Sequence, residues 1–116
     1  MTVHTITSRK DFVTLSLAHQ YLAIQAHTTY CQPCKTISPV FEACAADLES
    51  DHYVFAKFDI DAVPDLAFEF GANTVPAFYF FEDGDKADSV NGANVTALKK
   101  MVDEYAEKAK KFAEKN

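Results

Sequence analysis

The sequence predicts an α/β fold in which helices flank both faces of a mixed central β-sheet. Apolar stretches typical of strands alternate with amphipathic helical stretches through the first half of the chain, which indicates parallel strands joined by right-handed crossovers. Near the end, the dipeptide Asp83-Gly84 is typical of a two-residue hairpin turn and adds an antiparallel pair. The chain has 116 residues, 48% of them hydrophobic, so we expect residues 1–116 to form a single domain around one core.

Five stretches have the residue pattern of strands. Val3–Ile6 and Tyr21–His27 alternate between two faces, and Tyr53–Asp59 is rich in aromatic and β-branched residues. Ala77–Phe81 is apolar throughout, which predicts a strand covered on both faces whose phenylalanines belong to the core. The polar stretch Lys86–Val90 follows the hairpin turn and completes the predicted sheet.

Two helical stretches lie in the first half of the chain. Ser8, with Asp11 three residues later, resembles a helix start. After a pair of cysteines, apolar residues recur at steps of three and four and predict a long helix, which Pro39 should kink; they are Ile37, Val40, Phe41, Cys44 and Leu48. Because Cys44 falls on this apolar stripe, we expect its side chain to pack as a small buried hydrophobic group and not to serve as a regulatory thiol.

Two more helices are predicted in the second half. Pro64 suits the first turn of a short helix, PDLAFEF, which Gly71 then ends. Asn94 or Thr96 caps the last helix. The apolar stripe of that helix consists of Leu98, Met101, Val102, Tyr105, Ala109 and Phe112.

The charge pattern argues against nucleic acid or an anionic membrane as a partner. The net charge is -6, and the basic residues cluster only at the end of the chain, where acidic residues interleave with them. The first residues lack the basic start and apolar stretch of a secretory signal, and no stretch is long and apolar enough to span a membrane. We therefore expect a cytoplasmic protein.

Cys31 and Cys34, in the stretch TTYCQPCKTISP, are the candidates for chemistry. The chain has three cysteines, so they cannot all pair with one another. A disulfide that closes so short a ring contributes only about 2 kcal/mol in the chain-entropy model, which disfavours a purely structural bond. In a reducing compartment, two cysteines at this spacing are more often catalytic or metal-binding.

The rest of the sequence does not supply a metal or haem site around these cysteines. Zinc needs four ligands, and the chain has no second cysteine pair and no closely spaced histidines. Haem attachment would need a histidine where Lys35 stands. The scattered histidines are expected to be exposed or ordinary packing residues, with an influence of His27 on Cys31 as the alternative; they are His4, His19, His27 and His52.

The cysteines lie where a helix should begin. Pro33 suits the first helical position, because its missing N–H would be unsatisfied there in any residue. Cys31 would then stand just outside the helix and Cys34 within its first turn. The free backbone N–H groups, the positive end of the helix dipole and Lys35 all favour the thiolate form of Cys31, and the spacing allows the two sulfurs to bond.

Together with later motifs, this loop resembles the thioredoxin family and predicts its fold. YCQPCKTISP is followed by FAKFDID, VPAFYFFEDG and VNGA, and the resemblance runs from about Val3 to Tyr105. It implies a protein disulfide reductase in which Cys31 attacks a substrate disulfide and Cys34 resolves the mixed disulfide. It also implies protein substrates and a separate electron donor of the thioredoxin-reductase type. The chain has no glycine-rich nucleotide loop, so we expect no flavin or nicotinamide cofactor.

The resemblance further implies a substrate-binding surface. Pro76 would follow a cis peptide bond and pack against the cysteines, the backbone around Val75 would bind extended substrate segments, and Gly92 would leave room for them. An apolar rim is expected around Tyr30, Val75 and Gly92. The residues expected to bind substrate are Tyr30, Gln32, Pro33, Val75, Pro76 and Gly92.

Three residues depart from the family pattern. Gln32 replaces a glycine between the cysteines, and Tyr30 replaces a tryptophan before them. Gln25 replaces a buried aspartate that the family uses to remove the proton from the resolving cysteine, which a glutamine amide cannot do. Lys57 would thereby lose its acidic partner. A lysine desolvated without a counter-charge is driven towards its neutral form, so Lys57 is a candidate proton acceptor for Cys34.

Other functions fit the same fold. A redox-inactive protein-binding module would keep the apolar rim, although it would not need two thiols at bonding distance. An oxidant or isomerase is compatible with the motif, because the reduction potential depends on a fine energetic balance. Asp59 and Asp61 could be paired catalytic carboxylates, but acids that follow a strand are usually solvated.

Overall fold

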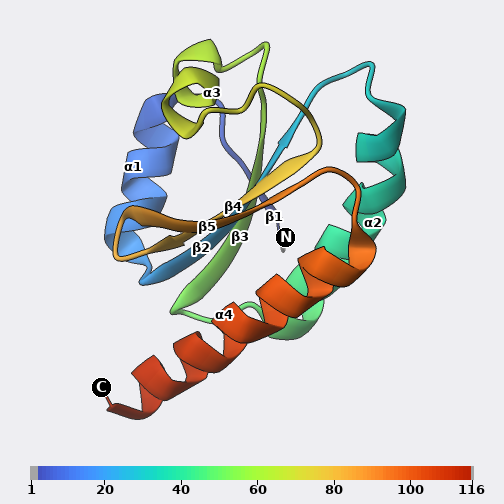
Figure 1. Ribbon diagram of the computed structural model, residues 1–116. Coiled ribbons are helices and arrows are strands. Elements are labelled where there is room, and N and C mark those ends of the chain that lie inside the picture. The colour runs from blue at the N-terminus through green and yellow to red at the C-terminus, as the bar shows by residue number, and fades with distance from the viewer. Residues whose placement is uncertain (1–2, 116) are drawn as a thin grey trace.

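A computed structural model describes residues 3–115, and it has a five-stranded sheet between two pairs of helices. The strands are β1 Val3–Thr5, β2 Tyr21–His27, β3 Tyr53–Asp59, β4 Ala77–Glu82 and β5 Asp85–Asn91. The helices are α1 Arg9–Ala18, α2 Gln32–Leu48, α3 Pro64–Phe70 and α4 Val95–Lys115. In Figure 1, α1 and α3 lie on one side of the sheet and α2 and α4 on the other.

The sheet is mixed, as predicted. Its strand order is β1-β3-β2-β4-β5, with β1, β3 and β2 parallel and the pairs β2–β4 and β4–β5 antiparallel. β2 and β3 are therefore adjacent and run in the same direction, so their carboxyl ends meet at one edge of the sheet. In open α/β sheets, functional sites form at that edge.

Each face of the sheet carries its own apolar layer. On the side of α2 and α4, Phe41 packs between Phe55 and Phe78, with ring centroids 5.4 and 5.3 Å apart. On the side of α1 and α3, Phe70 contacts the rings of Phe12 and Phe81 at 5.1 and 5.0 Å. Residues 78–81 are all buried, which confirms them as core. The layer on the side of α2 and α4 holds α2, and with it the cysteines, against the sheet.

The ends of several elements differ slightly from the prediction. α2 begins at Gln32, so Pro33 is its second residue, and the helix continues without interruption through Pro39. Asn94, and not Thr96, caps α4, because its side-chain oxygen accepts a hydrogen bond from the N–H of Ala97 at 3.0 Å. β1 ends one residue earlier and β5 is one residue longer at each end than expected. The start of α1 is as predicted, with Ser8 as its cap.

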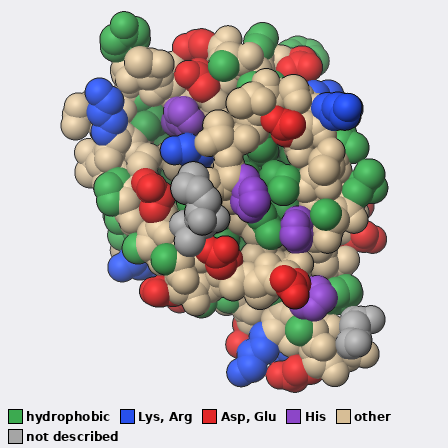
Figure 2. All heavy atoms as spheres, turned by 180° about the vertical axis from the view of Figure 1, so that it is seen from behind, with side chains coloured by type: hydrophobic (Ala, Val, Ile, Leu, Met, Phe, Trp, Pro, Cys, Tyr) green, Lys and Arg blue, Asp and Glu red, His purple; other side chains and the backbone are tan. Residues whose placement is uncertain are grey.

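The surface bears both signs of charge. On the face shown in Figure 2, acidic and basic side chains are interspersed with apolar and polar ones rather than gathered by sign. Among residues 3–115, no helix has both the length and the apolar character needed to cross a membrane.

Candidate active site

A disulfide joins Cys31 and Cys34 at the start of α2, with Cα atoms 5.2 Å apart. Cys31 is the N-cap of the helix, and its sulfur accepts a hydrogen bond from the backbone N–H of Cys34 at 3.1 Å. Both cysteines are buried, with exposed fractions of 6% and 3%. The predicted placement of Cys31 outside the helix and Cys34 in its first turn is therefore confirmed.

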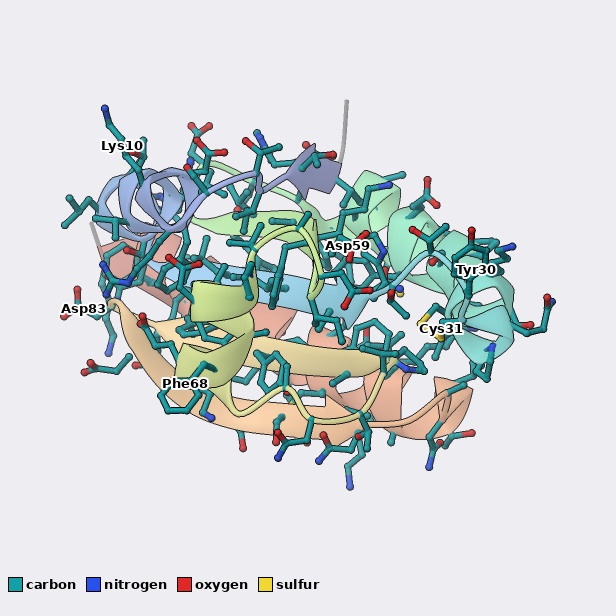
Figure 3. The ribbon with its side chains drawn as sticks, turned by 90° about the horizontal axis from the view of Figure 1, so that it is seen from above. Lys10, Tyr30, Cys31, Asp59, Phe68 and Asp83 are labelled. Carbon is teal, nitrogen blue, oxygen red and sulfur yellow. A yellow bond between two sulfur atoms is a disulfide. The ribbon has the colours of Figure 1, made fainter. Side chains whose placement is uncertain are left out.

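This geometry favours negative charge on the first sulfur. In the reduced protein, the N–H of Cys34 and the positive end of the helix dipole would both stabilise a thiolate at Cys31. Figure 3 shows the pair at one end of the molecule, opposite the hairpin at Asp83, with Tyr30 beside it. The sulfurs thus lie at the end of the sheet where β2 and β3 finish.

The loops before β4 and after β5 lie at the same edge of the sheet, because Ala77 pairs with Ala26 near the end of β2 and with Asn91 at the end of β5. The Val75-Pro76 peptide bond is cis, as the resemblance implied. The carbonyl oxygen of Pro76 accepts a hydrogen bond from the N–H of Gly92 at 2.8 Å, which ties the loop before β4 to the loop after β5. Gly92 has a φ of 87°, a conformation that favours glycine, and apart from its two neighbours in the chain no atom of residues 3–115 lies within 4 Å of the position that a Cβ would take.

The residues expected to bind substrate differ in exposure. Tyr30 is 95% exposed, and Gln32 and Pro33 are also exposed. Val75 is half-buried, and its side chain packs on the core layer beneath α3. A flat aromatic side chain held fully in solvent beside a buried disulfide is accessible to a partner protein. The binding roles themselves stay predictions.

Gln25 is buried and hydrogen-bonded to α2, not to a sulfur atom. Its exposed fraction is 1%, and its side-chain nitrogen donates to the hydroxyl oxygen of Ser38 at 3.0 Å. The Ser38 hydroxyl in turn donates to the carbonyl oxygen of Cys34 at 2.7 Å. No motif in the sequence marks Ser38 as part of the site. Its position four residues after Cys34, one helical turn later, was the available signal.

A small open pocket of about 210 Å³ lies beside the resolving cysteine. It is lined by His27, Thr28, Thr29, Cys34, Lys35, Ser38 and Lys57. The structure thus brings Lys57 to the same pocket as Cys34, as the hypothesis for Lys57 requires. His27 is half-buried and lines the same pocket as Cys34, and its influence on Cys31 stays a prediction.

The remaining candidates have ordinary structural roles. Cys44 is half-buried rather than fully buried, and burial raises the pKa of its thiol, which disfavours a reactive thiolate. Asp59 accepts a hydrogen bond from the N–H of Asp61, whose side chain accepts one from Thr28. These carboxylates therefore organise the loop after β3. Within residues 3–115, no three His, Cys, Asp or Glu side chains lie close enough together to hold a metal ion.

Comparison with known proteins identifies the family. The thioredoxin family model matches residues 3–104, which include the cysteine pair and the cis proline. The chain belongs to the thioredoxin family. Members of this family are thiol-disulfide oxidoreductases, and the disulfide between Cys31 and Cys34 supplies the pair of sulfurs that this chemistry needs. The chain accordingly has the thioredoxin fold together with the cysteine pair of that family.

Several thioredoxins resemble the chain over most of its length. "Thioredoxin-2" of Pyricularia oryzae is 36% identical over 88% of this chain, which spans only 58% of that relative. The thioredoxin of Coprinus comatus is 35% identical over 86% of this chain and 94% of its own length. The crystal structure of Malassezia sympodialis thioredoxin superposes on this structure with a TM-score of 0.84 at 33% identity. The match covers 90% of this chain and 90% of the Malassezia chain.

Proposed function

We propose that this thioredoxin-family chain reduces disulfide bonds in other proteins. The observation that carries the proposal is the buried Cys31–Cys34 pair at the start of α2, with an N–H group donating to the first sulfur. The Cys31 thiolate attacks one sulfur of the substrate disulfide and forms a mixed disulfide. Cys34 then attacks Cys31, which releases the substrate as two thiols and leaves the pair oxidised.

The substrate binds as an extended segment across the loops around the cysteines. Tyr30 offers an exposed aromatic face, and Gln32 and Pro33 offer exposed groups at the helix start. The side of this binding surface across from Tyr30 consists of Val75, Pro76 and Gly92, and the open space at Gly92 leaves room for the substrate segment. Backbone groups beside Val75 would pair with the substrate backbone, and such pairing accepts many sequences.

The cycle needs an external supply of electrons. The reagent of the chain is its own dithiol, so a separate reductase of the thioredoxin-reductase type would return the disulfide to two thiols after each turnover. No further cofactor is proposed. Cytoplasmic placement suits a redox pair accompanied by the unpaired Cys44, because that compartment keeps such thiols reduced.

Reduction of insulin by dithiothreitol tests this function. We expect the protein to accelerate insulin precipitation well above the rate with dithiothreitol alone, and its potential against glutathione to be more reducing than about -230 mV, near those of thioredoxins. No acceleration would favour the redox-inactive binding module. A potential near those of disulfide isomerases or oxidants would reverse the proposed direction of electron flow.

Lys57 is assigned to the resolving step, either as a neutral proton acceptor or through its charge. It lines the pocket beside Cys34 and makes no ion pair with any residue in the range 3–115. We expect Lys57→Met to slow release of the substrate by about 10-fold, because the loss of a nearby positive charge makes the Cys34 thiolate less stable. Rapid-mixing kinetics should show the initial attack by Cys31 nearly unchanged. If both steps are as fast in Lys57→Met as in the unaltered protein, Lys57 has no part in the mechanism.

A further inference from the structure

The carboxyl ends of β2 and β3 carry a polar cluster that faces α2. Side chains alternate between the two faces of a strand, so the odd-numbered residues of β2 and β3 lie on the α2 side. The first of these residues, Tyr21, Ala23, Tyr53 and Phe55, belong to the apolar layer beneath α2 and α4. The later ones are polar: Gln25 pairs in register with Lys57, and His27 with Asp59. At the ends of β2 and β3, four polar side chains thus occupy the positions on the α2 side that apolar core residues occupy earlier in the same strands.

No carboxylate of the described residues 3–115 lines the pocket that Cys34 shares with its neighbours. Gln25, which stands where the family has an aspartate, uses its side-chain nitrogen to hold Ser38, and the Ser38 hydroxyl is bound to a backbone carbonyl. The resolving thiol must therefore give its proton to another group. The side chains of this pocket that can be neutral bases are those of His27 and Lys57.

We propose that His27 accepts the proton of Cys34 when this thiol resolves the mixed disulfide. The inference rests on the thiol–disulfide chemistry proposed above and adds a residue to it. A ring nitrogen of His27 takes the proton directly or through one water molecule, for which a pocket of about 210 Å³ has ample room. Of the two roles proposed for Lys57, the second then applies: its side chain, in the same pocket, stabilises the sulfur anion as it forms.

Atoms and electrons balance in this step. The S–H bond of Cys34 breaks and its proton moves to the imidazole, while the sulfur keeps the electron pair and attacks the sulfur of Cys31. The Cys31–Cys34 bond forms as the bond from Cys31 to the substrate sulfur breaks, so the cysteine pair is oxidised and the substrate is reduced. The departing thiolate takes a proton from the imidazolium or from water, and His27 returns to its neutral form.

The surroundings of His27 keep it available as a base. Burial lowers the pKa of His27, Lys57 adds to the lowering, and Asp59 opposes it. Lys35 on α2 lines the same pocket, and Asp61 lies in the adjoining loop, bonded to Thr28. Since the pKa is lowered, the imidazole stays neutral to a lower pH than an ordinary histidine. An ordinary lysine side chain, by contrast, is almost wholly charged near neutral pH.

Rapid mixing of the reduced protein with dithiobis(nitrobenzoic acid) separates the two steps, since each thiol exchange releases one coloured thiolate. We expect His27→Asn to slow the second release by about 10-fold or more and to leave the first within about 2-fold. The matched control is His4→Asn, because His4 is exposed on β1, outside this pocket. An unchanged second release in His27→Asn would overturn the proposal, whatever the effect of Lys57→Met.

A pH profile and chemical rescue distinguish a proton acceptor from a structural residue. In the unaltered protein the second release should slow as the pH falls through a midpoint below 6.5, the ordinary histidine value, because the imidazole becomes charged. His27→Asn should lose this midpoint, and added imidazole should speed the second release in His27→Ala. If imidazole does not speed the second release in His27→Ala, the proposal is wrong. Absence of both releases from the unaltered protein would instead contradict the proposed function.

Discussion

Replacing Cys31 with serine should reduce the insulin-reductase rate to that of dithiothreitol alone. A hydroxyl group is not ionised at neutral pH and does not attack a disulfide, so no mixed disulfide forms and Cys34 has nothing to resolve. Serine can still cap α2, so the fold should persist. The measurement is the onset of insulin precipitation, with circular dichroism to confirm the fold.

Two further cysteine variants test whether the loss of activity is specific to Cys31. Cys34→Ser should form the mixed disulfide and then stall, so that mass spectrometry finds substrate bound to Cys31. Cys44→Ser should behave like the unaltered protein, because Cys44 lies towards the far end of α2 and partial burial raises the pKa of its thiol. A Cys31→Ser variant as fast as the unaltered protein would refute the assignment of the nucleophile.

Replacing Phe41 with alanine should lower the free energy of unfolding by about 3–5 kcal/mol. The ring of Phe41 is fully buried and packs on Phe55 and Phe78, which anchors the middle of α2 to the sheet. Its removal leaves a cavity between the helix and two strands that cannot collapse without moving α2. Urea titration of the oxidised protein, followed by circular dichroism, measures the change.

Phe68 on α3 provides the control for this prediction. Its side chain is 89% exposed, so Phe68→Ala should change the free energy of unfolding by no more than about 0.5 kcal/mol. Similar losses in the two variants would mean that the layer around Phe41 contributes less than its burial indicates.

Local patterns in the sequence were sufficient to predict most of the architecture. Alternation in Tyr21–His27, the three-to-four spacing in the long helix and the turn at Asp83-Gly84 depend on neighbouring residues alone, and the structure has the corresponding elements. Pro33 between the cysteines likewise predicts a helix start with both sulfurs on one turn. Element ends were less certain, since capping of α4 by Asn94 rather than Thr96 depends on the detailed path of the loop.

The sequence by itself determined the order of strands and helices and the closeness of Cys31 to Cys34, because both follow from interactions within one or two helical turns. Only the tertiary structure decided what surrounds Cys34. His27 and Lys57 lie on different strands, and Gln25 reaches Ser38 across thirteen residues of chain. Such neighbours meet only when two parallel strands pair side by side and α2 packs over their ends, which depends on burial of apolar surface throughout the molecule.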